Sequence, residues 1–304
     1  MSYGLEEVKA KNVVFSILGE EDAVHIMETE YAPQTLLSYI SLFPCYMAGE
    51  REGQAISVDF AYLYDLAVLD TELRKLVLAA SLDIEQSLRA VFLVDCRRTG
   101  VGDELVKAFV ASDVDHLSLT YTPDNMDILT KKGFCEVPIA ELSLNSFLEI
   151  LQFGTFQRLL RFFYNTHAPT LYGKATAPFE NYLDALRHIR NAAAHNTSLI
   201  GQLNETGPFK QNLQLLSILG RKGIRHKTLT TNMSKPVMHD LLSLLQLYHI
   251  LMPSLQKEQL QKLILMFLTE RCTTHSSYYE KSPTLLSAYH FLLQSTPMLL
   301  SENS

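Results

Sequence analysis

The segment Leu186-Arg-His-Ile-Arg-Asn-Ala-Ala-Ala-His-Asn196 holds the residues in this chain that are best suited to chemistry. Arg190 stands five positions before His195 and directly before Asn191. Arginine is a planar, permanently charged group that pairs with phosphate oxygens, and histidine is the side chain type that exchanges protons nearest neutral pH. A cation, an amide and a proton carrier at this spacing are suited to cleaving a phosphodiester.

A helix over 179–200 must position these side chains, and Pro178 with the residues after it is a start signal for that helix. At about 100° per residue, the apolar stripe of the helix contains Tyr182, Leu186, Ile189, Ala193 and Ile200. The polar side contains Asp184, Arg187, His188, Asn191 and His195. Asn191 and His195 are four residues apart and can touch.

Arg190 does not share a face with His195, because the two lie roughly 140° apart around the helix. Arg190 must therefore reach around the helix or meet the histidine of a second copy across an interface. The three small residues at 192–194 are all alanine and leave room for such a partner. The geometry favours a site shared between two helices.

The alternative interpretation of the same residues is a solvated helix face. Arg-x4-His recurs by chance, and Arg221 with His226 repeats the spacing in an expected loop. Arg187 and His188 are weaker candidates for RNA binding. Lys222 and Arg225 belong to a basic, glycine-bearing segment over 220–227 that could grip an RNA backbone, or could be a solvated turn.

The length allows one large domain or two smaller ones, and the composition indicates an ordered protein. We expect a single helical domain over 1–304, with possible lobes at 1–135 and 136–304. Of the 304 residues, 47% are hydrophobic, and only 13 are glycine and 11 proline. The four cysteines form no C-x-x-C pair, so we expect reduced thiols and no zinc site. The start of the chain lacks signal-peptide features, and 282–301 makes a poor membrane span. We therefore expect a soluble, cytoplasmic protein without a cofactor or a membrane partner.

The net charge of −7 conceals a gradient along the chain. Up to Gln152 there are 11 Lys and Arg against 25 Asp and Glu, a net charge of −14. From Phe153 onward there are 15 against 8, a net charge of +7. The basic part could meet RNA or another polyanion, or the acidic part could dock on it within the fold.

Hydrophobic periodicity is helical almost throughout and predicts an all-α fold. The expected helices lie at 60–94, 101–110, 124–132, 139–151, 156–164, 179–200, 238–252 and 260–268. The expected loops lie at 49–54, 113–123, 166–178 and 201–210.

Three segments, in order, carry a resemblance to a known family. The first is Asp59-Phe-Ala-Tyr-Leu-Tyr-Asp-Leu-Ala-Val-Leu-Asp-Thr-Glu-Leu-Arg74 followed by Asp83-Ile-Glu-Gln-Ser-Leu-Arg89. The second runs from Pro138-Ile-Ala-Glu-Leu-Ser143 through Leu151-Gln-Phe-Gly-Thr-Phe156. The third is Tyr172-Gly-Lys174 with Leu186-Arg-His-Ile-Arg-Asn-Ala-Ala-Ala-His195. Over roughly 36–300 the chain resembles the bacterial abortive-infection (Abi-like, AbiD/AbiF) branch of the HEPN superfamily of ribonucleases.

The resemblance implies a HEPN-type helical bundle with additional helices, and a homodimer whose paired signature helices form the active cleft. It further implies metal-independent RNA cleavage in phage defence or a toxin–antitoxin system, restrained by an RNA or protein antitoxin. Arg190, Asn191 and His195 match the signature, and Glu85 with Arg89 would support the cleft or form a salt bridge within their helix. Family members often continue after the histidine with a second histidine and an arginine, whereas Asn196-Thr-Ser-Leu199 follows here.

We therefore expect an endoribonuclease toxin that leaves a 2′,3′-cyclic phosphate. His195 would act as general acid or base, Arg190 would stabilise phosphate charge, and Asn191 would orient the histidine or bind the same oxygens. The main alternative is a non-catalytic HEPN-type module that binds a small RNA or a partner protein. A weaker alternative is a helical scaffold. Motifs of other enzyme classes are absent from the sequence.

Overall fold

The computed structural model describes residues 3–113, 117 and 139–301, and helices dominate these residues. The α-helices are α1 (Tyr3–Ala10), α2 (Glu20–Thr29), α3 (Pro33–Leu37), α4 (Phe60–Thr99), α5 (Glu104–Ser112), α8 (Leu144–Ile150), α9 (Phe153–Tyr172), α10 (Leu183–Ala194), α11 (Leu213–Arg221), α12 (His226–Met233), α13 (Pro236–Leu251), α14 (Ser254–Met266) and α15 (Pro283–Leu300). Strands β1 (Val13–Val14) and β2 (Val58–Asp59) form one short parallel pair. The all-α prediction is confirmed.

The shorter helical turns connect these elements. They are η1 (Ile40–Leu42), η2 (Ile139–Glu141), η3 (Glu180–Tyr182), η4 (Gly201–Asn204), the π-helical η5 (Phe267–Arg271) and η6 (Ser276–Tyr279). Within the described residues, no helix combines the length and the apolar character needed to cross a membrane.

The chain groups into two compact units, which do not follow the lobes considered from the sequence. Unit 1 contains Met1–Ser81 and Asp184–Ser304, and unit 2 contains Leu82–Leu183. Helix α4 contributes residues 60–81 to the first unit and 82–99 to the second. The expectation of a single domain remains a prediction for a folding experiment.

In unit 1, a buried carboxylate starts α4. Asp59 is 4% exposed and accepts a hydrogen bond from the backbone of Ala61 at 2.9 Å, in the manner of an N-cap. Its other oxygen accepts from the backbone of Ser16 at 2.8 Å and of Ile17 at 3.2 Å. One side chain thus begins the helix and ties the N-terminal segment to it.

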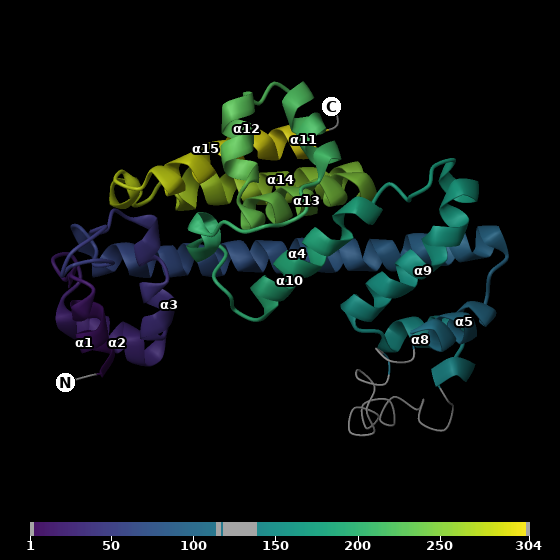
Figure 1. Cartoon of the computed structure of the whole chain (residues 1–304), viewed down its shortest axis with the longest axis horizontal. Coiled ribbons are helices and arrows are strands. Elements are labelled where there is room, and N and C mark those ends of the chain that lie inside the picture. The colour runs from purple at the N-terminus through teal and green to yellow at the C-terminus, as the bar shows by residue number, and fades with distance from the viewer. Residues whose placement is uncertain (1–2, 114–116, 118–138, 302–304) are drawn as a thin grey trace. The chain divides into compact units, whose positions relative to one another are not determined.

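The core of unit 1 is built around α13, which packs against α15 (Figure 1). Most of its residues are buried, including Leu242, Leu245 and Leu247 at 0–1% exposure. A helix that is apolar on nearly all sides must lie inside other elements. Helix α10 reaches the same unit with one apolar side, so its polar side is left outward.

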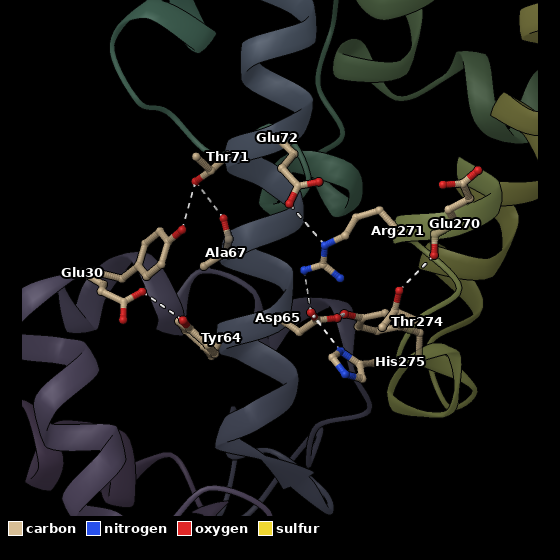
Figure 2. Close-up of polar contacts among 12 residues, drawn as sticks. Glu30, Tyr64, Asp65, Ala67, Thr71, Glu72, Glu270, Arg271, Thr274 and His275 are labelled. Atoms are coloured by element: carbon tan, nitrogen blue, oxygen red, sulfur yellow. Dashed lines mark hydrogen bonds and ion pairs between the residues drawn. The ribbon is translucent and has the colours of Figure 1, made fainter. Parts of the chain in front are cut away.

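A polar cluster ties the turn after α14 to α4 (Figure 2). The carboxylate of Asp65, 6% exposed, accepts from Arg271 at 2.8 Å, from His275 at 3.1 Å and from the hydroxyl of Tyr279. Arg271 also donates to Glu72 at 3.2 Å. Residues that are some 200 positions apart are thereby joined.

Unit 2 is held by two polar networks, one around the half-buried Arg89 and one around the buried Asp95. Arg89 donates to Glu85 at 2.8 Å and to the carbonyl oxygens of Leu148 and Leu151, so the salt bridge expected within this helix is confirmed. Asp95, 1% exposed, accepts from the hydroxyl of Tyr164 at 2.8 Å and of Tyr172 at 2.6 Å. The arginine and Tyr172 of the recognised segments therefore have structural contacts within this unit.

Several predicted boundaries are wrong, and two of them lie around the segment with the Arg-x4-His spacing. The loop expected at 166–178 begins too early, because α9 continues to Tyr172 with Pro169 inside it and ends at Gly173, whose φ is +63°. The helix expected at 179–200 begins as η3 and continues as α10 only to Ala194. The helix expected at 124–132 lies outside the described residues, as does most of the loop at 113–123.

Candidate active site

The polar and apolar sides of α10 are arranged as the sequence predicts. Leu186, Ile189 and Ala193 are at most 2% exposed and face the interior. His188 and His195 are exposed, and Arg190 and Asn191 are half-buried. The helix therefore presents its chemically active residues at the surface while its apolar stripe fixes the backbone.

Helix α10 ends in a turn built around a left-handed residue. Asn196 has φ +57°, its backbone N–H bonds to Ala193 at 3.4 Å, and Thr197 bonds back to Ala192 at 2.9 Å. This pattern is the Schellman motif, which terminates a helix at a residue that tolerates the left-handed region. Asn196 is therefore why the helix stops before residue 200. His195 is the capping residue just before it.

The ring of His195 lies free at this end. Its backbone N–H bonds to Asn191 at 2.9 Å, but its imidazole forms no hydrogen bond or ion pair with the residues that the structure describes. A histidine that exchanges protons with a substrate needs a ring that the substrate can reach.

Arg190 and Asn191 form a pair next to this histidine. The guanidinium of Arg190 donates to Oδ1 of Asn191 at 3.2 Å. The structure thus joins Asn191 to Arg190 rather than to the His195 ring. Arginine has five N–H donors, and with Oδ1 occupied the amide of Asn191 still has its N–H₂ to donate. The pair is an array of donors suited to phosphate oxygens.

A buried ion pair on α4 contacts the turn after α10. Asp70 and Arg74 are 0% and 8% exposed, and Arg74 Nε lies 3.0 Å from Asp70 Oδ2. This contact is an ion pair without hydrogen-bond alignment. Arg74 donates to Asn196 Oδ1 at 2.6 Å, and Asp70 accepts from the backbone of Ile200 at 2.6 Å. The pair therefore holds both ends of the turn.

The buried environment of Asp70 disfavours the charged form of its carboxyl group. Burial raises the pKa of this carboxyl, and the backbone N–H of Ile200 and the guanidinium of Arg74 oppose that rise. A buried charge is retained only where such partners satisfy it. The sequence analysis did not single out Asp70 or assign a structural role to Asn196. The available signals were an acid–base pair in an apolar helix and an asparagine directly after a helical segment.

His188 lies on the same side of α10 as His195 and faces an acid on α13. Its Nδ1 is 3.7 Å from Asp240 Oδ2, and a guanidinium nitrogen of Arg187 is 3.4 Å from its Nε2. Asp240 Oδ1 is also 3.0 Å from His239, which is 4% exposed and accepts from the backbone of Asn212 at 2.9 Å. Asp240 thus joins a surface histidine to a buried one.

The two remaining RNA-binding candidates are not equivalent. Lys222 donates to the carbonyl oxygen of Met298, and burial lowers the pKa of its ammonium. Arg225 is exposed at the start of α12. Arg225 can reach a phosphate from this position, whereas Lys222 must first leave the end of α15.

An apolar cavity of about 170 Å³ lies behind α10 rather than at its polar side. Its wall includes Ile189 of α10, Leu73 of α4 and Met238 of α13. The lining is mostly aliphatic and contains no arginine or lysine, so this space belongs to the core rather than to a phosphate site. The candidate chemistry is confined to the exposed side and the C-terminal end of α10.

The sequence was compared with protein families, curated proteins and solved structures. The profile of the family described as Abi-like protein matches residues 36–201, which is more than half of the chain. No curated protein and no solved structure shows significant similarity. The matched range includes Asp70, Arg74 and all of α10, and the family suggests a role in abortive infection, a form of phage defence. The chain belongs to the Abi-like protein family.

Proposed function

We propose that this protein is an endoribonuclease toxin of an abortive-infection or toxin–antitoxin system, with a HEPN-type site formed by Arg190, Asn191 and His195. The observation that supports it most is the end of α10. There, an accessible imidazole sits on a backbone that is held by buried contacts, next to a pair of side chains with spare donors. Substrate access and a fixed backbone are both needed for proton transfer.

In the proposed reaction, the ribose 2′-hydroxyl loses its proton and attacks the adjacent phosphorus. The bond to the 5′-oxygen breaks, that oxygen takes up a proton, and a 2′,3′-cyclic phosphate and a 5′-hydroxyl remain. His195 carries one of these protons, because imidazole can both accept and donate near neutral pH. Arg190 and the amide of Asn191 donate to the phosphate oxygens on which negative charge grows.

Two copies of the chain would share the site. Arg190 and His195 point roughly 140° apart on one helix, so one phosphate meets both most readily between two facing helices. Ala192 is half-buried and Ala194 is exposed, and these small side chains allow a second helix to approach. A protein or RNA antitoxin that covers this side of α10 would block the site.

The decisive experiment is cleavage of total bacterial RNA by the purified protein and by Arg190→Ala and His195→Ala. Loss of one charge-stabilising donor typically costs about 10²–10³ in rate, so both variants should be close to inactive. The matched control is the double variant His25→Ala/Arg97→Ala, which removes one exposed histidine and one exposed arginine outside α10 and outside the basic segment 220–227. Full activity is expected there. Cyclic-phosphate ends and cleavage in EDTA test the product and the metal independence.

The second candidate function is binding without cleavage, and a particular contact favours it. The residue after His195 is Asn196, whose side chain is committed to Arg74 and adds no cation for RNA. In this case the wild type captures a small RNA or a partner protein without cutting it. Binding would then be unchanged in His195→Ala.

A further inference from the structure

The turn that follows α10 is fixed from its buried side by α4. Arg74 makes three contacts: with Asn196 Oδ1 at 2.6 Å, with Thr71 Oγ1 at 2.9 Å and with Asp70 at 3.0 Å. Asp70 uses its other oxygen for the backbone of Ile200. Charge-assisted hydrogen bonds to a largely buried arginine and carboxylate are stronger than neutral ones, and they leave a bound segment little freedom.

Asn196 has two roles in this turn. Its backbone adopts the left-handed region that ends the helix, a position usually filled by glycine. Its side chain adds what glycine lacks, an oxygen that accepts from a buried arginine. The asparagine is therefore explained by its contact with Arg74 as well as by its backbone conformation.

His195 is the direct neighbour of this residue. Its ring has no hydrogen bond of its own within the described part of the chain, so the fold places this residue only through the backbone from which the ring extends. We propose, on the basis of the proposed catalytic role of His195, that Arg74 and Asp70 are positioning residues. They fix where the His195 ring is presented by holding Asn196 and the turn after it.

The test begins with Asn196→Gly, which is compatible with the left-handed backbone conformation and removes the side chain whose oxygen Arg74 holds. The mobility of the His195 ring is measured by NMR relaxation, with its signal assigned through its loss in His195→Ala. RNA cleavage is measured in parallel. We expect a more mobile ring, and a kcat reduced about 10- to 100-fold with little change in KM, because small misplacements of a catalytic group cost rate.

Two further variants separate positioning from general loss of stability. Asn196→Asp keeps an acceptor for Arg74 and should retain the ring mobility of the wild type and most of its activity. Arg271→Met breaks the polar cluster around Asp65 in the same unit and should lower stability without changing the ring.

The proposal fails if Asn196→Gly has the ring mobility and the kcat of the wild type, or if Asn196→Asp behaves like Asn196→Gly. A wild type that does not cleave RNA would refute the proposed function instead. In that event the ring mobilities still decide whether Arg74 positions His195.

Discussion

Replacing Asp65 by asparagine should lower the free energy of unfolding by about 2 kcal/mol. Removing one partner of a buried ion pair typically costs about 3–5 kcal/mol, since the other charge is left uncompensated. Here Arg271 is 25% exposed at its side chain and keeps Glu72 at 3.2 Å, so part of that cost is avoided. An asparagine also retains one oxygen for the three donors that Asp65 serves (Figure 2).

The effect should depend on pH in one direction. Burial alone would raise the pKa of Asp65, but the hydrogen bonds from Tyr279, Arg271 and His275 outweigh it and hold the pKa below the usual value. The carboxylate therefore stabilises the folded state above the unfolded pKa of about 3.9, and this contribution is lost as pH falls through the folded pKa. The difference between wild type and Asp65→Asn should be complete at neutral pH and should shrink below about pH 4.

Urea unfolding at a series of pH values measures both quantities. The control is Glu20→Gln, which removes an exposed ion pair with Lys9 and should cost at most about 0.5 kcal/mol. The reasoning is refuted if Asp65→Asn costs no more than this control at neutral pH. It is also refuted if the difference from wild type does not shrink in acid.

Three other outcomes are expected. If the site is shared between two copies, mixing Arg190→Ala with His195→Ala should restore about one quarter of wild-type RNA cleavage. Half of the dimers are then mixed, and each mixed dimer has one of its two sites intact. A mixture as inactive as the separate variants argues against sharing. Gly173→Ala should cost about 1 kcal/mol in thermal unfolding, because φ is +63° although the added Cβ meets nothing within 4 Å. Gly154→Ala, also open but not left-handed, should show no such loss, and equal losses would contradict the conformational explanation. Tyr172→Phe should lower the free energy of unfolding, measured in urea, by about 1–2 kcal/mol, because Asp95 loses the hydroxyl that donates to it at 2.6 Å. An unchanged urea midpoint would show that Tyr164 alone satisfies this carboxylate.

The face of α10 could be predicted from sequence, but its end could not. Apolar residues at helical spacing fix which side is buried, and Leu186, Ile189 and Ala193 lie there as expected. The spacing continues to Ile200, which is also buried, so periodicity alone extends the helix too far. Ile200 reaches the interior through the turn at Asn196 instead. An asparagine after the last turn is a stop signal for a helix, but the apolar spacing continues past it and favoured a longer helix.

A related reason explains the early end predicted for α9. A proline usually breaks a helix, because it lacks the N–H that bonds to the fourth residue before it. Pro169 loses the single bond of its own nitrogen, and α9 continues past it for three more residues to Tyr172. The signal that ends this helix is Gly173, four residues later.

The residues suited to chemistry were visible in the sequence, whereas those that hold them were not. Arg190, Asn191 and His195 are recognised by type and spacing within one helix. The contact between Arg74 and Asn196 joins positions 122 residues apart. No local pattern encodes such a pairing, because it depends on how α4 and α10 pack in three dimensions.

The interrupted course of unit 1 has a consequence for synthesis of the protein. Its parts, Met1–Ser81 and Asp184–Ser304, are separated by the whole of unit 2, which is continuous in sequence. As the chain leaves the ribosome, the inserted segment is available for folding before the partners of residues 65–74 of α4 have been translated, because those partners lie at 196–200 and 271. Arg74 cannot form its contact with Asn196 until residue 196 has been translated, and α10 cannot pack in its unit until α13 and α15 have been translated. Under the proposed function, the site would form only when nearly all of the chain has emerged, which would spare the ribosome that makes it.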